Sequence, residues 1–216
     1  MGVLLESEIN IIKNKLRADF QKPEVRKESG HLWRVGLKEK IYYDFDQIIY
    51  SPKKCEWVVG LFTEKVRDIV AHGKEVDFLA FIQKDTGGTT GALKLEGAIS
   101  IATGIPSTTI RLDREGKAGR IKFPWGEGEE KKGIISNAKA ILITDHCSSG
   151  KEILRAIKTL AYYGAKVEDI IAFTTNTEKI KENIDIFKEK GITIHTFNRV
   201  PEDMNLVGIS SNSSSV

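Results

Sequence analysis

One stretch decides the fold of this chain: Ala140-Ile-Leu-Ile-Thr-Asp-His-Cys-Ser-Ser-Gly150. It begins with four apolar residues and ends in a polar turn that closes on a glycine, and residues 151–161 then carry apolar side chains at helical spacing. This pattern predicts a buried strand, a tight turn and an amphipathic helix. In such a unit the N–H groups of the turn and of the helix N-terminus converge at the carboxyl end of the strand, where a phosphate is favoured. Parallel sheets also contain turns of this kind without a ligand, so the stretch alone leaves both alternatives open.

From residue 77 onward the chain alternates between strand and helix patterns, which predicts a parallel sheet with right-handed crossovers. We therefore expect an α/β fold, an open and mostly parallel twisted sheet with helices on both faces. The expected strands are residues 77–83, 107–111, 140–143, 166–174 and 192–197, and the expected helices between them are residues 92–103, 151–161 and 178–189.

The residues before this alternation predict a smaller N-terminal part. An amphipathic helix over residues 3–20 is followed by a polar loop or hairpin over 24–40 and an aromatic-rich strand over 41–50. Ser51-Pro52 then opens a long helix that ends at Gly73. The expected organisation is an N-terminal part over 1–50, an α/β core over 51–203 and a serine-rich, disordered tail over 204–216.

The composition of the 216 residues bounds the class of protein. With 29% charged residues and a formal net charge of +3, bulk electrostatics do not favour a nucleic-acid partner. The sequence contains neither a run of roughly 18 apolar residues nor a secretory signal, so we expect a cytoplasmic protein without a membrane partner. The two cysteines, Cys55 and Cys147, show no metal-binding spacing and no disulfide framework.

Three polar loops follow expected strands, at residues 84–90, 111–133 and 145–150. Such loops gather on one edge of a parallel sheet, so we expect these three to lie close together. Two of them are short, rich in Gly, Ser and Thr, and suited to anions. The long loop supplies positive charge suited to covering a polyphosphate, from Arg111, Arg114, Lys117, Arg120 and Lys122. A sugar with phosphates at both ends fits this arrangement.

The arrangement and several residues resemble the type I phosphoribosyltransferases, which use 5-phosphoribosyl 1-pyrophosphate. The family signature is an apolar strand, two acidic residues, two variable residues, two small hydroxyl residues and a glycine. Aligned on Gly150, the second acidic position is Asp145, and the first has become Thr144. The resemblance implies that Asp145 binds a ribose hydroxyl and that the turn binds the 5-phosphate. The implied donor-binding residues are Thr144, Asp145, His146, Cys147, Ser148, Ser149 and Gly150.

The resemblance also implies a pyrophosphate loop, formed by Lys84, Asp85, Thr86, Gly87 and Gly88. Arg111 would reach the pyrophosphate as well. In the family a lysine at a fixed spacing in the long loop acts across the dimer; that spacing gives Glu115 here, between Arg114 and Lys117. The candidate catalytic residues are Asp145, Arg111 and Lys117.

Within the family the likeness is greatest to the orotate phosphoribosyltransferases and covers nearly the whole chain. Residues 30–46 follow the course of that family's hood segment, which leads into a strand with paired aromatic residues. The likeness implies that Tyr42 or Tyr43 stacks on a planar base and that Arg34 or Lys38 contacts an acidic pyrimidine. Because successive residues on a strand face opposite sides, one of the two tyrosines should face the core.

Other roles compete for the residues of the decisive stretch. Asp145 could cap the following helix instead of binding a sugar. His146 could act as a base or be a solvated loop histidine. Cys147 is expected to be an inert thiol, and Cys55 to be buried in the core.

The resemblance implies a Mg²⁺-dependent homodimer that transfers phosphoribose to a nucleobase, with orotate the best match, and releases pyrophosphate. Such catalysis depends on positioning and leaving-group stabilisation, without a protein nucleophile. A second hypothesis is a catalytically impaired protein of the same fold that senses the donor or a nucleotide, which Thr144 and the altered basic loop favour. An unrelated phosphate-binding α/β enzyme is a third. No helix-turn-helix precedes the core, so a DNA-bound regulator is not expected.

Overall fold

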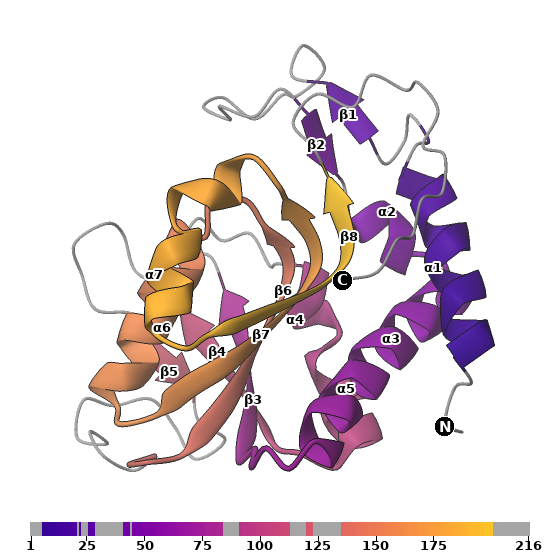
Figure 1. Ribbon diagram of the computed structural model, residues 1–216. Coiled ribbons are helices and arrows are strands. Elements are labelled where there is room, and N and C mark those ends of the chain that lie inside the picture. Colours follow the sequence, from indigo (N-terminus) through magenta and orange to yellow (C-terminus); the bar gives the residue numbers. More distant parts are fainter. Residues whose placement is uncertain are drawn as a thin grey trace.

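The structure is a computed structural model that describes residues 6–20, 22, 26–28, 41–43, 45–83, 91–112, 120–122 and 135–200 (Figure 1). The expected pyrophosphate loop, most of the long basic loop, most of the hood segment and the serine-rich tail lie outside these residues.

A mostly parallel sheet forms the centre of the molecule. In the described part of the chain its strand order is β5-β4-β3-β6-β7-β8. The parallel strands are β3 (Phe78–Gln83), β4 (Ser107–Arg111), β6 (Lys139–Cys147), β7 (Lys166–Asn176) and β8 (Thr193–Val200). The edge strand β5 (Arg120–Lys122) runs antiparallel to β4. The predicted open, mostly parallel sheet is confirmed.

Helices cover both faces of this sheet (Figure 1). α3 (Pro52–Ala71), α4 (Gly91–Lys94) and α5 (Glu96–Thr103) pack on one face, and α6 (Lys151–Tyr162) and α7 (Ile184–Glu189) pack on the other. Strand alternation explains why the apolar runs are continuous: in β6, Ile141 and Ile143 enter the first core, whereas Ala140 and Leu142 enter the second.

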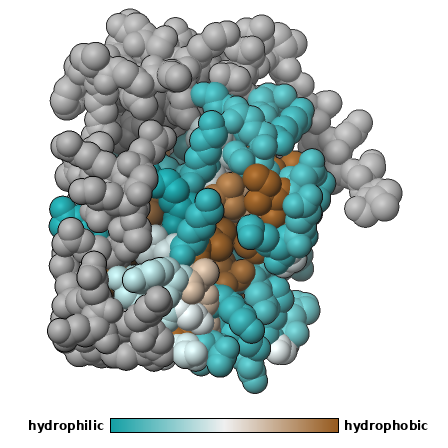
Figure 2. Space-filling model, turned by 90° about the vertical axis from the view of Figure 1, so that its left-hand side faces the viewer, coloured by the Kyte–Doolittle hydropathy of each residue, from teal (hydrophilic) through white to brown (hydrophobic). Residues whose placement is uncertain are grey.

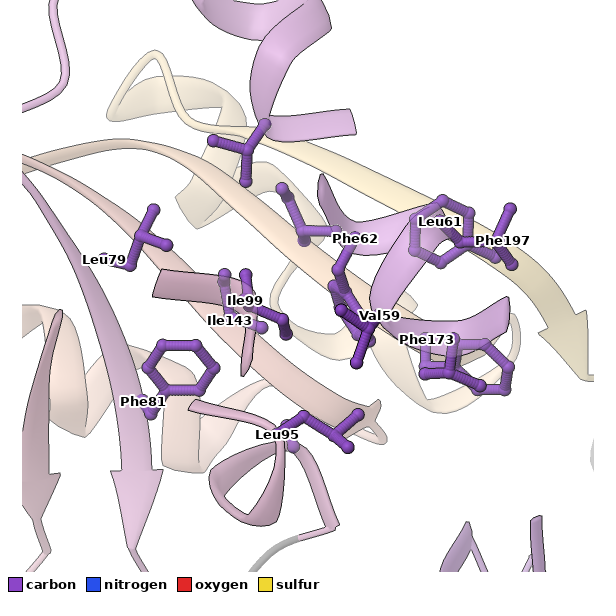
Figure 3. Close-up of a cluster of buried hydrophobic side chains, with 14 of the residues drawn as sticks. Val59, Leu61, Phe62, Leu79, Phe81, Leu95, Ile99, Ile143, Phe173 and Phe197 are labelled. Carbon is purple, nitrogen blue, oxygen red and sulfur yellow. The ribbon is translucent and has the colours of Figure 1, made fainter. Parts of the chain in front are cut away.

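The first core is built around aromatic side chains that approach one another from α3, β7 and β8 (Figure 3). The ring of Phe62 lies edge-on to that of Phe197, with centroids 5.4 Å apart, and Phe173 lies 6.1 Å from Phe62. Over the second core, the face that carries α6 and α7 shows apolar side chains at its centre with hydrophilic ones beside them (Figure 2).

The N-terminal part packs against α3 and the end of β8. α1 (Glu6–Phe20) buries Leu16 completely, and its Arg17 Nε donates to Asn198 Oδ1 at 3.3 Å. β1 (Arg26–Glu28), within the expected loop or hairpin over 24–40, pairs antiparallel with β2 (Ile41–Tyr43), the start of the strand expected from residue 41.

Several expected element boundaries were wrong. The expected strand over 41–50 stops at Tyr43, and α2 (Phe45–Ile49) follows, because the apolar side chains of Phe45, Ile48 and Ile49 recur at helical spacing and contact the first core. The expected helix over 92–103 is divided into α4 and α5 at the buried residue Leu95.

Two further boundaries differ on the other side of the molecule. Residues 178–189 form a 3₁₀ helix, η3 (Lys179–Glu182), and then α7, separated at Asn183, whose side chain donates to Ser149 O at 2.7 Å. β6 continues to Cys147, so the polar turn after it is shorter than expected, and β5 lies within the segment expected to be a loop.

None of the helices in the described segments is both long enough and apolar enough to cross a bilayer.

Candidate functional site

The carboxyl ends of the parallel strands lie at one edge of the sheet, as expected. There Gln83 of β3 lies beside Arg111 of β4, and Cys147 of β6 lies beside Thr175 of β7. The three polar loops of the sequence therefore all start at this edge. Arg111 is half-buried at the end of β4, where it is the last residue before the long basic loop begins at Leu112.

The turn between β6 and α6 is held tightly by the second core. Gly150 has a φ of +80°, a left-handed conformation that L side chains rarely adopt, and a Cβ there would lie 2.8 Å from Phe187 Cε2. Asn183 fixes the turn from the other side through Ser149 O. α6 is twelve residues long and starts at Lys151, so the positive end of its dipole lies at the turn. This geometry suits a phosphate.

Asp145 is half-buried near the end of β6, and both of its carboxylate oxygens accept backbone hydrogen bonds. Oδ2 accepts from Gly91 N at 2.8 Å, and Oδ1 accepts from His146 N at 2.8 Å. The alternative in which Asp145 caps the following helix is wrong, because the N-cap of α6 is Gly150. The carboxylate instead binds the first N–H of α4, 54 residues away in the sequence.

Thr144 is buried, with 4% of its surface exposed. Its hydroxyl lies 3.3 Å from His146 O and 3.4 Å from Asp145 Oδ1, so its one proton can be donated to either acceptor. In the sheet Thr144 lies beside Ala172 and faces the second core. Its hydroxyl is thus engaged by its own strand.

His146 is a half-buried strand residue and not a solvated loop histidine. Its Nδ1 lies 2.7 Å from Thr174 Oγ1, and that hydroxyl donates to Asp145 O at 3.2 Å. Because the hydroxyl proton is used by Asp145 O, the contact is satisfied when His146 Nδ1–H donates to Thr174.

Cys147 is almost fully buried, with 1% exposure. Burial, together with a smaller contribution from the Glu152 carboxylate, raises the pKa of its thiol from 9.0 to about 12. The expected inert thiol agrees with this placement, and only the backbone of Cys147 can serve a ligand at the turn. Cys55, expected in the core, is half-buried against the first core, and burial raises its pKa as well.

The remaining candidates have incomplete structural descriptions. Lys84–Gly88, Lys117, Arg34 and Lys38 lie outside the described residues, and Tyr42 and Tyr43 are described only as part of β2. Their roles stay predictions. Among the described residues, no group of three or more His, Cys, Asp or Glu side chains is arranged to hold a metal ion.

Sequence reasoning missed three residues that shape the site: Gly91, Thr174 and Asn183. Thr174 could have been identified from the sequence, because it is a polar residue at the end of a buried strand, as Asp145 is. Gly91 and Asn183 act through contacts that local patterns do not report.

Comparisons with known proteins support the predicted resemblance independently. No family model matches the sequence. The chain is 28% identical over 187 residues to the orotate phosphoribosyltransferase of Pyrococcus horikoshii, covering 86% of this chain and 90% of that protein. It is also 28% identical over 189 residues to the orotate phosphoribosyltransferase of Streptococcus pyogenes serotype M5, covering 87% and 79%.

Solved phosphoribosyltransferase structures have a similar fold. The orotate phosphoribosyltransferase from Aeropyrum pernix superposes with a TM-score of 0.63 at 14% identity, covering 86% of this chain and 93% of that chain. An adenine phosphoribosyltransferase from Trypanosoma brucei gives a TM-score of 0.62 at 15% identity, covering 93% and 87%.

The described part of the chain has the fold of the solved phosphoribosyltransferases, which confirms the expected fold class. In sequence the chain is a divergent relative of the orotate phosphoribosyltransferases, and the predicted resemblance is confirmed.

Proposed function

We propose that this protein transfers phosphoribose from 5-phosphoribosyl 1-pyrophosphate to a nucleobase, with orotate as the preferred base, and releases pyrophosphate. The observation that carries the proposal is the juxtaposition of the Asp145 carboxylate and the Ser148–Gly150 turn at the carboxyl edge of a phosphoribosyltransferase fold. The orotate phosphoribosyltransferases related in sequence support the choice of base.

In this proposal the 5-phosphate binds at the turn, where backbone N–H groups and the α6 dipole favour negative charge. Asp145 accepts the ribose hydroxyls. An ionised carboxylate has about four lone-pair sites. Two of these sites are used by Gly91 N and His146 N, so the carboxylate retains acceptor capacity for the sugar.

Transfer builds positive charge on the ribose ring and negative charge on the leaving pyrophosphate, so catalysis consists of positioning and charge stabilisation. Arg111 stands at the edge from which the proposed pyrophosphate loop departs, and Lys117 belongs to the basic loop that follows it. Both are proposed to stabilise the leaving group.

Mg²⁺ fits this donor set as an ion bound mainly by the substrate. Mg²⁺ in proteins is commonly held by one or two carboxylates together with substrate phosphates. Asp145 is the described carboxylate placed to hold it, directly or through water. When bound, the ion would neutralise charge on the pyrophosphate.

A second candidate function is a donor or nucleotide sensor with impaired catalysis. It is favoured by Thr144, which occupies one of the two acidic positions and whose buried hydroxyl bonds within its own strand.

One experiment separates the two functions. The purified protein is incubated with the donor, Mg²⁺ and, in separate reactions, orotate, uracil, adenine, hypoxanthine or guanine, and pyrophosphate release is followed. We expect turnover with orotate and little with the others. Absence of turnover with every base, together with tight donor binding in calorimetry, would favour the sensor.

We further propose that the protein is a cytoplasmic homodimer in which the basic loop after Arg111 serves the partner's site. Sedimentation velocity should show a single species of twice the 24.1 kDa chain mass. A monomer that retains full turnover would contradict this proposal.

A further inference from the structure

Gly91 is confined from two directions. Its N–H donates to Asp145 Oδ2 at 2.8 Å. On its other side, a Cβ added to Gly91 would lie 2.1 Å from Cδ1 and 2.9 Å from Cε1 of Phe45, closer than real Cβ contacts allow. The space for any side chain at position 91 is therefore filled by the ring of Phe45.

Moving the ring of Phe45 away from Gly91 would be energetically unfavourable. It is 6% exposed and lies edge-on to Phe173 of β7, with ring centroids 4.8 Å apart. A ring packed in this way shifts only together with its helix, α2.

α2 and α4 are also joined by charge. Lys94 Nζ lies 2.6 Å from Asp46 Oδ2 and 5.5 Å from the centroid of the Tyr50 ring. Both partners of the ion pair are about one third exposed, so the pair stabilises the contact between α2 and α4 only modestly. The tight packing of Phe45 on Gly91 is the stronger restraint.

The contact between α2 and α4, called the joint below, connects two parts of the proposed site. α2 starts two residues after Tyr43, the end of the strand assigned to the base, and Gly91 follows directly on residues 84–90, which include the proposed pyrophosphate loop. Asp145, on the other side of Gly91, is the proposed sugar ligand. A displacement at Gly91 therefore moves the base side and the donor side together.

We propose that Gly91 is a positioning residue that holds the base-binding strand and the sugar-binding carboxylate at a fixed separation. The inference rests on the proposed function for the identity of the two ligands. Gly91 acts through Phe45 on one side and through Asp145 on the other.

The test is a double-mutant cycle of Gly91→Ala and Phe45→Ala, with KM for donor and for orotate measured separately. Gly91→Ala should raise both KM values about tenfold, because the added methyl group must push α2 and α4 apart. Phe45→Ala removes the ring that the methyl group would meet. In that background Gly91→Ala should change either KM by less than about twofold.

Gly97→Ala is the matched control. Gly97 lies in α5, and a Cβ there would meet no atom within 4 Å. This variant should keep both KM values within about twofold of those of the unsubstituted protein.

The inference is overturned if Gly91→Ala leaves both KM values unchanged, or if its effect is equally large with and without Phe45. Turnover of the unsubstituted protein would still support the proposed function in either case. If Gly91→Ala alone does not fold, Phe45→Ala is compared with the double variant, and a difference of more than about threefold in either KM overturns the inference.

If the unsubstituted protein shows no turnover, the proposed function fails and the joint is tested without catalysis. Amide hydrogen exchange at residues 45–50 should accelerate in Gly91→Ala, and calorimetric affinity for the donor should fall about tenfold. Unchanged exchange and unchanged affinity overturn the inference.

Discussion

At the residue scale, the Asp145 carboxylate has a structural task in addition to the proposed ligand task. Each of its two oxygens accepts a different backbone N–H, one from β6 itself and one from α4. An asparagine has only one acceptor oxygen, so it can satisfy one of these N–H groups and would direct its NH₂ group at the other. The usual near-isosteric substitution is therefore not neutral for the ligand-free protein.

Asp145→Asn should lower the free energy of unfolding of the ligand-free protein by about 1–3 kcal/mol, the cost of leaving a partly buried donor unsatisfied. It should also weaken donor binding. Chemical denaturation and calorimetry measure the two effects. Asp185→Asn is the control, because that exposed carboxylate contacts only Lys188 in the described structure, at 3.4 Å, and the substitution should change neither quantity. Full stability of Asp145→Asn together with weaker donor binding would assign the carboxylate to the ligand alone.

At the scale of elements, the β6–α6 turn depends on the helix behind it. Gly150 is required for two reasons, its left-handed φ of +80° and the 2.8 Å approach that a Cβ would make to Phe187 Cε2 of α7. The first reason is local and is visible in the sequence as a glycine after two serines. The second is tertiary, because Phe187 reaches the turn only when α7 packs on the second core.

Gly150→Ala and Gly191→Ala together separate these reasons. Gly191 also has a positive φ, +67°, but a Cβ there meets no atom within 4 Å. Gly191→Ala should cost about 1–2 kcal/mol of stability through the left-handed conformation alone. Gly150→Ala should cost a further ~1–3 kcal/mol through overpacking. Thermal or urea unfolding measures the difference, and equal losses in the two variants would exclude a role for Phe187.

Most elements were predictable because their signals are local. The period of apolar residues identified α3, α6 and the five parallel strands in the described part, since burial on one or both faces leaves a pattern within the element itself. The expected strand over 41–50 is one case where the local signal was wrong. Residues 45–49 are rich in aromatic and β-branched side chains but form a helix, because Phe45 and Ile48 are buried against the first core.

At the scale of the whole molecule, the sheet separates two cores, and groups buried in them couple global stability to pH. Cys147 lies in the second core with a thiol pKa of about 12, against 9.0 for an ordinary thiol. Between these two values, the Cys147 thiol keeps its proton in the folded state and has lost it in the unfolded state. The stabilisation from the neutral thiol is therefore complete below pH 9 and is lost as the pH rises toward about 12.

The stability advantage of the unsubstituted protein over Cys147→Ala should narrow above pH 9 by about 1.4 kcal/mol per pH unit. Urea titrations at a series of alkaline pH values measure it, and lysines and tyrosines that titrate in both proteins cancel in the difference. Cys55→Ala removes a half-buried thiol. The difference in stability between this variant and the unsubstituted protein should therefore narrow less above pH 9. A difference independent of pH would mean that the Cys147 thiol ionises normally in the folded protein.

Part of the candidate site, like part of the fold, was predictable from the sequence. Asp145 and the Ser148–Gly150 turn were predictable because polar residues directly after a buried strand of a parallel sheet must lie at its carboxyl edge. The burial of Thr144 and the pairing of His146 with Thr174 were not, because both depend on how far β6 continues beside β7.

The sequence by itself determined the alternation of strands and helices, the edge of the sheet at which polar loops collect, and the turn at Gly150, because these follow from periodicity and backbone conformation within short stretches. Only the tertiary structure decided that the Asp145 carboxylate holds Gly91, 54 residues away, and that Phe45 fills the space beside that glycine. The physical reason is that these contacts are selected by close packing between distant segments, for which no local pattern exists.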